Sequence, residues 1–148
     1  MTPTAPELLA GCAAALSKPL RPEDGSVFGA ARLTTVATIN VLVAQECATG
    51  SAVRVAENAA LRALLADAAP GYGGALEEAR TIGDGGLSLA ALDQANAALR
   101  RRLIGLHQAV EAVGDRQMDR RILALYRDMA LGREMKLPAS RPVVASLR

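Results

Sequence analysis

The clearest hydrophobic pattern in the chain follows Ser88. Apolar residues and one asparagine recur there at alternating spacings of three and four: Leu89, Leu92, Asn96, Leu99, Leu103, Leu106, Val110 and Val113. This spacing is typical of the buried seam of an α-helix that packs lengthwise against its neighbours. Ser88 can cap the start of this helix, and Gly114 interrupts the pattern at its end.

A second apolar face follows Asp115, which can cap another helix. That face consists of Met118, Ile122, Leu125 and Met129 and extends toward Gly132. Earlier in the chain, Pro6-Glu7 is typical of the first turn of a helix, which we expect to end near Ser17.

Residues 27–69 follow a helical pattern almost without a break, and we expect Pro70 to end it. Gly50-Ser51 allows two interpretations of this stretch. Either Ser51 caps a second helix, or Gly50 lies inside one long helix at a cost of about 1 kcal/mol.

The remaining segments have the composition of connectors. Residues 18–26 hold two prolines and a glycine, so 1–26 is predicted to be an N-terminal helix followed by a loop. Residues 71–86 hold six glycines and predict a connector with one helical turn around 75–80. The tail 137–148 contains Pro138 and Pro142 and is expected to be extended. These elements predict a single all-α domain spanning 1–148, an up-and-down bundle of four to five helices.

Composition supports this fold class. The chain has 31 Ala and 21 Leu among 148 residues, and only 2% aromatic residues, which excludes a mostly β fold. It has no uncharged apolar run of 18 residues, and no basic region precedes its first apolar stretch. We therefore expect a cytoplasmic protein that does not enter a membrane, with Cys12 and Cys47 as reduced, buried thiols.

Charge is distributed unevenly along the chain. Residues 1–99 carry 6 basic and 10 acidic groups, whereas residues 100–148 carry 11 basic and 5 acidic groups. The net charge of +2 and the scarcity of aromatic residues disfavour nucleic-acid binding. The candidate contacts to a protein partner are Arg100, Arg101, Arg102, Arg116, Arg120 and Arg121. The alternative is that these arginines only form a solvated face.

Few residues have the pattern of a catalytic or metal site. His107 is the only histidine, so the paired Glu-x-x-His motifs of di-iron bundles cannot be built. Histidine phosphotransfer domains usually place a lysine three residues after their histidine, where this chain has Val110. A phosphotransfer role for His107 remains the catalytic alternative to a structural one. We expect no catalytic residue, no metal and no cofactor.

Three polar residues interrupt apolar helix faces. Asn40 and Glu46 lie in a stretch that is apolar nearly all round, which predicts a central, buried helix. Asn96 occupies a position in the seam after Ser88, where a polar residue commonly fixes the register. We expect these three polar residues to form hydrogen bonds between helices. The alternative is that Asn40 and Glu46 line a polar pocket together with His107.

A five-residue segment occurs twice, as Asn58-Ala59-Ala60-Leu61-Arg62 and again 38 residues later as Asn96-Ala97-Ala98-Leu99-Arg100. A repeat architecture needs at least three copies. We interpret the recurrence as chance in a sequence rich in Ala, Leu and Arg.

Part of the chain resembles a known family. The residues that carry the likeness are Pro6-Glu7-Leu8-Leu9, Phe28, Ala37, Val43-Ala44-Gln45-Glu46, Glu57 and Leu61-Arg62-Ala63-Leu64-Leu65. They resemble the small helical proteins encoded beside aminoglycoside-phosphotransferase-like kinases and acyl-CoA dehydrogenases. The resemblance implies a non-catalytic accessory subunit of a kinase that acts on hydroxyacyl-CoA substrates, and it transfers no catalytic residue.

A looser resemblance connects Ala56-Glu57-Asn58-Ala59-Ala60-Leu61-Arg62 with helical flagellar or secretion chaperones. Those proteins present an amphipathic helix face to an export substrate. We therefore expect a protein-binding subunit, accessory to a kinase or to an enzyme of acyl-CoA metabolism. A phosphotransfer bundle, a chaperone and a self-associating scaffold remain as alternatives, and a homo-oligomer is compatible with each.

Overall fold

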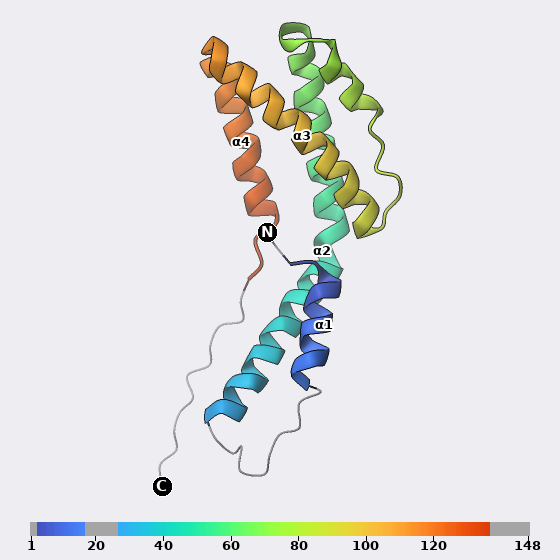
Figure 1. Cartoon of the computed structure of the whole chain (residues 1–148), viewed down its shortest axis with the longest axis vertical. Coiled ribbons are helices and arrows are strands. Elements are labelled where there is room, and N and C mark those ends of the chain that lie inside the picture. Colours follow the sequence, from blue (N-terminus) through green and yellow to red (C-terminus); the bar gives the residue numbers. More distant parts are fainter. Residues whose placement is uncertain (1–2, 17–26, 137–148) are drawn as a thin grey trace. The chain divides into compact units, whose positions relative to one another are not determined.

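The computed structural model describes residues 3–16 and 27–136, and these are 86% helical with no strand. The elements are α1 (Ala5–Leu16), α2 (Val27–Tyr72), the 3-10 helix η2 (Gly74–Thr81), α3 (Leu89–Val113) and α4 (Arg116–Gly132) (Figure 1). The all-α prediction is confirmed. The predicted loop at 18–26, the end of the first helix at Ser17 and the extended tail at 137–148 lie outside the described residues.

The chain divides into two compact units, and α2 contributes to both. The first unit contains residues 1–48 and 135–148, and the second contains residues 49–134. The division into two units argues against a single domain, and the continuous helix that belongs to both argues for one. A single domain spanning 1–148 therefore stays a prediction.

Helix α2 settles the question raised by Gly50. It is one continuous helix of 46 residues, and the buried Gly50 lies inside it, where its carbonyl accepts a hydrogen bond from Arg54 Nη1 at 3.3 Å. The expected stop at Pro70 is wrong by two residues. The last turn continues to Tyr72, and the helix ends where Gly73 adopts a φ of 110° and donates its N–H to the Ala69 carbonyl at 3.0 Å.

Ion pairs and hydrogen bonds define the directions of the helices in the second unit. Arg54 donates a hydrogen bond to Asp93, and Asn96 donates one to Glu57. Each bond joins residues 39 apart, so α2 and α3 run parallel. Between them the connector returns antiparallel to α2, since Arg62 bonds the Ile82 carbonyl. Helix α4 runs antiparallel to α2, because Arg121 pairs with Asp67 and Arg133 with Glu57. Successive elements therefore alternate in direction, because the connector that contains η2 runs antiparallel to both α2 and α3 (Figure 1).

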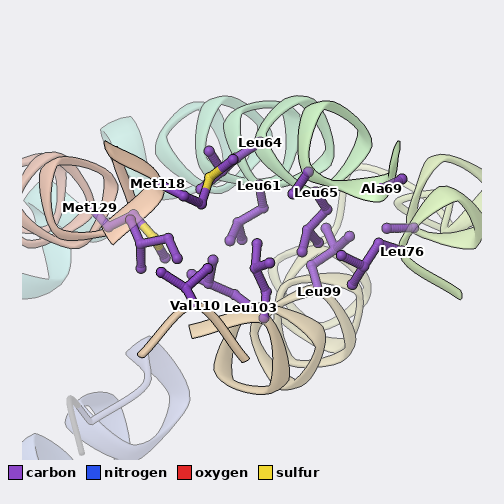
Figure 2. Close-up of a cluster of buried hydrophobic side chains, with 14 residues drawn as sticks. Leu61, Leu64, Leu65, Ala69, Leu76, Leu99, Leu103, Val110, Met118 and Met129 are labelled. Atoms are coloured by element: carbon purple, nitrogen blue, oxygen red, sulfur yellow. The ribbon is translucent and has the colours of Figure 1, made fainter. Parts of the chain in front are cut away.

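The second unit has a continuous apolar core, shown in Figure 2. Its buried members are Leu61, Leu64, Leu65, Ala68, Ala69, Leu76, Ala79, Leu99, Leu103, Leu106, Val110, Met118, Ile122 and Met129. The seam predicted in α3 is therefore correct over most of its length. At its end it is wrong, because Val113 is 69% exposed in the last turn before Gly114.

The predicted caps are present in the second unit. Ser88 Oγ accepts from the Ala91 N–H, and Asp115 Oδ1 accepts from the N–H groups of Gln117 and Met118, both at 3.0 Å. Gly114 has a φ of 72° and ends α3 in the left-handed conformation that favours glycine.

The described part of the first unit has fewer buried apolar residues: Ala5, Cys12, Val36 and Val43. The expectation that both thiols are buried is correct for Cys12 and wrong for Cys47, which is exposed. The central position expected for the apolar stretch of α2 is also wrong. In its most apolar 18-residue window only 17% of the residues are buried.

Candidate functional site

A network of polar side chains crosses the second unit. Its members Glu57, Asn58 and Asn96 are buried, and its members Arg62, Asp84 and Arg133 are half-buried. Glu57 is 6% exposed and lies on α2. Its carboxylate accepts two hydrogen bonds from the guanidinium of Arg133, at 2.7 Å from Nε and 2.5 Å from Nη2. Asn96 Nδ2 donates to Glu57 Oε2 at 3.2 Å, so the negative charge is neutralised and held by three donors.

The network continues from the two asparagines to the connector. Asn96 Nδ2 donates to Asn58 Oδ1 at 2.8 Å, and Asn58 Nδ2 donates to Asp84 Oδ1 at 2.8 Å and to the Leu92 carbonyl. Asp84 also pairs with Arg62, whose Nε bonds the Ile82 carbonyl at 2.7 Å. The Arg62 guanidinium holds the pKa of Asp84 below its ordinary value, and the Asn58 amide acts in the same direction against the effect of burial.

Both copies of the segment that occurs twice in the sequence contribute an asparagine to this network. Asn58 and Asn96 face each other across the parallel helices α2 and α3, and Leu61 and Leu99 are both fully buried. Among the described residues no buried side-chain nitrogen or oxygen lacks a hydrogen-bond partner. The network therefore holds helices together, as expected for Asn96, and it leaves no buried polar atom directed at a ligand.

The sequence analysis missed Glu57 and Arg133 as a pair. They are 76 residues apart, and no periodic pattern links them. One signal in the sequence could have indicated that Glu57 is buried. It directly precedes Asn58, and Asn58 holds the same place in the recurring segment as Asn96, which was predicted to lie in the buried seam.

His107 lies in the second unit between two carboxylates. Its Nε2 is 3.1 Å from Asp119 Oδ1 and 3.9 Å from Glu111 Oε1, and its ring centroid is 5.7 Å from that of Tyr126. The side chain is 22% exposed. A phosphoryl group on Nε2 would meet the negative charges of both carboxylates and would displace the bond to Asp119.

The other two members of the predicted polar pocket belong to the first unit. Asn40 is exposed, and its Oδ1 accepts a weak hydrogen bond from Cys12 Sγ at 3.5 Å. Glu46 is 8% exposed. The prediction of burial is therefore correct for Glu46 and wrong for Asn40. His107 belongs to the second unit, whereas Asn40 and Glu46 belong to the first.

The six predicted arginines have different surroundings. Arg102 pairs with Glu78 at 3.2 Å, and Arg121 pairs with Asp67 at 2.7 Å, so these two bind residues of their own chain. Arg101 and Arg102 line a hollow of about 310 Å³ together with Ile82 and Ala98. The other four arginines, Arg100, Arg101, Arg116 and Arg120, are exposed.

Asp115 links the start of α4 to the end of α2. The backbone N–H of Met118, the Tyr72 hydroxyl and the N–H of Gln117 hold the pKa of Asp115 below its ordinary value. The Tyr72 hydroxyl donates to Asp115 Oδ2 at 2.7 Å, and this bond to the carboxylate raises the pKa of Tyr72.

An apolar cavity of about 260 Å³ opens between α2 and α4 in the second unit. Its lining comprises Val53, Ala56, Glu57, Ala60, Leu125, Asp128, Met129 and Gly132. The carboxylate of Glu57 is already occupied by Arg133, so the cavity offers mainly apolar surface.

The first unit exposes a face of α2 that carries no charge. The nine exposed residues between positions 33 and 48 are Leu33, Thr34, Thr35, Ala37, Asn40, Val41, Ala44, Cys47 and Ala48. We call this set the uncharged face. Arg32, which precedes this set along the helix, is half-buried, and Glu46 is buried. Lys136 is exposed, and its backbone exchanges two hydrogen bonds with the side chain of Gln45 on the same stretch of α2.

The same helix meets the length and composition criteria for a membrane span. Within Ala31–Tyr72 an 18-residue window reaches a mean hydropathy of 1.2. Core helices of soluble proteins meet the same criteria, so the expectation that the chain does not enter a membrane stays a prediction. The described residues contain no group of three or more His, Cys, Asp or Glu side chains arranged to hold a metal ion.

Comparison of the chain with models of protein families, with curated proteins and with solved structures found no match. The resemblance to the proteins encoded beside kinases and acyl-CoA dehydrogenases stays a prediction.

Proposed function

We propose that this chain is a non-catalytic protein-binding subunit and that the uncharged face of α2 is needed for that binding. The uncharged face is the observation that carries the proposal. Solvated protein surfaces usually carry about 25–35% charged residues, whereas the nine exposed residues of this face include none. Exposed apolar side chains, here Leu33 and Val41, are one mark of a protein–protein interface.

The surroundings of the polar side chains support a non-catalytic role. The buried carboxylates and amides of the second unit are hydrogen-bonded to one another. His107, the candidate for phosphotransfer, is hydrogen-bonded to Asp119. These groups stabilise the fold and are not presented to a substrate.

The candidate partner comes from the family resemblance: a kinase of the aminoglycoside-phosphotransferase type or another enzyme of acyl-CoA metabolism. Exposed arginines of the second unit would then contribute to partner choice, because guanidinium groups pair bidentately with carboxylates. Arg116 and Arg120 are four residues apart on α4, are both exposed and serve this purpose best.

The chaperone alternative is disfavoured by burial. The segment that carries this resemblance contains Glu57, Asn58 and Leu61, which are all buried within the second unit. That helix face already packs against α3 and α4, so it is not available to an export substrate.

A pull-down from the native host's extract tests the proposal. Tagged wild type should recover a kinase-like or acyl-CoA enzyme in near-stoichiometric amount, identified by mass spectrometry. Leu33→Glu/Val41→Glu places two charges on the uncharged face and should reduce recovery at least tenfold with helicity unchanged. The matched control Leu87→Glu/Val113→Glu alters two exposed residues of the second unit and should recover the enzyme like wild type. Equal recovery by all three baits would show that the uncharged face has no part in binding.

The contribution of the arginines needs a separate variant. Arg116→Glu/Arg120→Glu should weaken binding to the recovered enzyme at least tenfold and leave the circular dichroism spectrum unchanged, because both side chains are exposed. Unchanged affinity in a binding titration would remove these arginines from the interface.

A further inference from the structure

Lys136 attaches the last described part of the chain to α2, beside the uncharged face. Its backbone N–H donates to Gln45 Oε1 at 2.9 Å, and its carbonyl accepts from Gln45 Nε2 at 2.7 Å. Gln45 follows Val41 by four residues and precedes Ala48 by three, so it lies on the same side of the helix as these two members of the uncharged face. The chain after Lys136 therefore starts at the edge of that face.

The composition of residues 137–148, which lie outside the described residues, suits an uncharged surface. Four of these twelve residues are large and aliphatic, and two, both arginines, have charged side chains. Residues 17–26 are also outside the described residues, and they carry four charged side chains among ten residues and one large aliphatic one. Covering an uncharged surface with charged groups costs desolvation free energy. The C-terminal tail, residues 137–148, is therefore the better match to the uncharged face.

We propose that the C-terminal tail docks on the uncharged face of α2 and covers it in the free chain. From Leu33 to Ala48 the face extends over about 22 Å, at about 1.5 Å per residue of helix. Twelve extended residues reach about 40 Å, so the tail is long enough to follow the whole face from its attachment at Lys136. A segment joined this closely to its site has an effective concentration on the order of millimolar, so a second copy competes poorly at micromolar protein concentration.

The docked tail regulates the proposed binding of an enzyme, because one face cannot hold two occupants. The enzyme binds only those chains in which the tail has left the uncharged face, so the tail lowers the apparent affinity by the fraction of chains that are open. This competition rests on the proposed function. The docking of the tail does not depend on it.

Photo-cross-linking in the full-length chain tests the docking. The photoreactive amino acid p-benzoylphenylalanine in place of the exposed Val41 should link α2 to residues 137–148 on irradiation. Trypsin cleaves after Arg32, Arg54 and Lys136, so mass spectrometry finds the two segments as one linked pair of peptides. A mixture of unlabelled and isotope-labelled chains separates links within a chain from links between copies. The same amino acid in place of the exposed Ala97 on α3 is the control and should give no link to residues 137–148.

Variants of the tail test what holds it and what it competes with. Leu137→Ser/Val143→Ser/Val144→Ser/Leu147→Ser removes the four large aliphatic side chains and should reduce the yield of the link at least about tenfold, because apolar contact is what the face offers. The matched control Arg141→Gln should be linked like the unchanged tail. In the pull-down, the serine variant should recover more enzyme than wild type, because the competitor is removed.

Other results would overturn the inference. Links to residues 1–32 alone, links only between copies, or no link at all would rule out the docking of the tail. If Leu33→Glu/Val41→Glu nevertheless loses the enzyme in the pull-down, the proposed function stands without the docking. If the tail is linked but that variant recovers the enzyme like wild type, the docking stands and the proposed function fails. A serine variant that recovers less enzyme than wild type would make the tail part of the interface and rule out competition.

Discussion

Arg133 shows how one side chain at the end of a helix can support the centre of the second unit. It follows the last residue of α4, and its guanidinium bonds the buried carboxylate of Glu57 and the Asn96 side-chain oxygen. A buried carboxylate without its cation retains the cost of desolvation and loses the attraction that offsets it. The position of α4 against α2 therefore depends on this guanidinium.

Replacing Arg133 by alanine should lower the free energy of unfolding by about 2–4 kcal/mol, because Glu57 remains buried without its partner. Urea unfolding followed by circular dichroism measures the change. Arg127→Ala is the matched control on the same helix, since Arg127 pairs with Asp128 at the surface. That variant should change the stability by no more than about 0.5 kcal/mol. Similar losses in the two variants would contradict a special role for Arg133.

Asp84 gives the second unit a defined dependence on pH. The Arg62 guanidinium lowers the pKa of Asp84 in the folded chain, so its stabilising effect is present above the unfolded-state pKa of about 4. The effect is lost as pH falls through the lower, folded-state pKa. Asp84→Asn should therefore be less stable than wild type at neutral pH, and its stability should fall less between about pH 5 and pH 2. Parallel stability curves for the two proteins over that interval would contradict this origin.

At the scale of elements, one glycine inside α3 and one directly after it have opposite roles. Gly105 lies inside the helix, and a Cβ there would meet no atom within 4 Å. Gly114 follows the helix and has a φ of 72°, a backbone conformation that residues with a Cβ rarely adopt. The same substitution should therefore have opposite effects at the two positions.

Gly105→Ala should stabilise the chain by about 1 kcal/mol through helix propensity, and Gly114→Ala should destabilise it by about 1 kcal/mol through backbone strain. Thermal unfolding of the two variants beside wild type tests both signs in one experiment. A loss of stability on Gly105→Ala would mean that this face of α3 is covered by another molecule in solution.

At the scale of the whole molecule, the two units have unequal cores. The apolar cluster of the second unit has fourteen buried members, whereas the described part of the first unit buries Ala5, Cys12, Val36 and Val43. Local stability follows the amount of buried apolar surface. The described part of the first unit is thus expected to open locally more readily than the second unit.

Hydrogen exchange should report this difference. Amides of residues 30–45 in α2 should exchange faster than those around Leu99 and Leu103 in α3 when the protein is dilute. Equal protection of both segments would contradict the unequal stability of the units.

The candidate site could be predicted from the sequence only in part. Asn96 was identified because a polar residue interrupts an otherwise apolar seam. Its partner Asn58 was not identified, because the recurrence of the segment 58–62 at 96–100 was interpreted as chance. Arg133 and Glu57 were missed because a salt bridge between distant residues leaves no periodic pattern. The uncharged face was missed for a different reason. A helix that is apolar on all sides is expected to be buried, but the pattern does not say whether other helices of the same chain bury it.

The sequence by itself determined the fold class, the helix caps at Ser88 and Asp115, and the buried seam of α3. These features depend on spacing, propensity and hydrogen bonds between near neighbours, all of which can be read along the chain. Only the tertiary structure decided that α2 and α3 run parallel, that Arg133 neutralises Glu57, and that one face of α2 is not covered by the described residues. These features depend on which surfaces meet, and the pairing of surfaces is set by packing of the whole molecule.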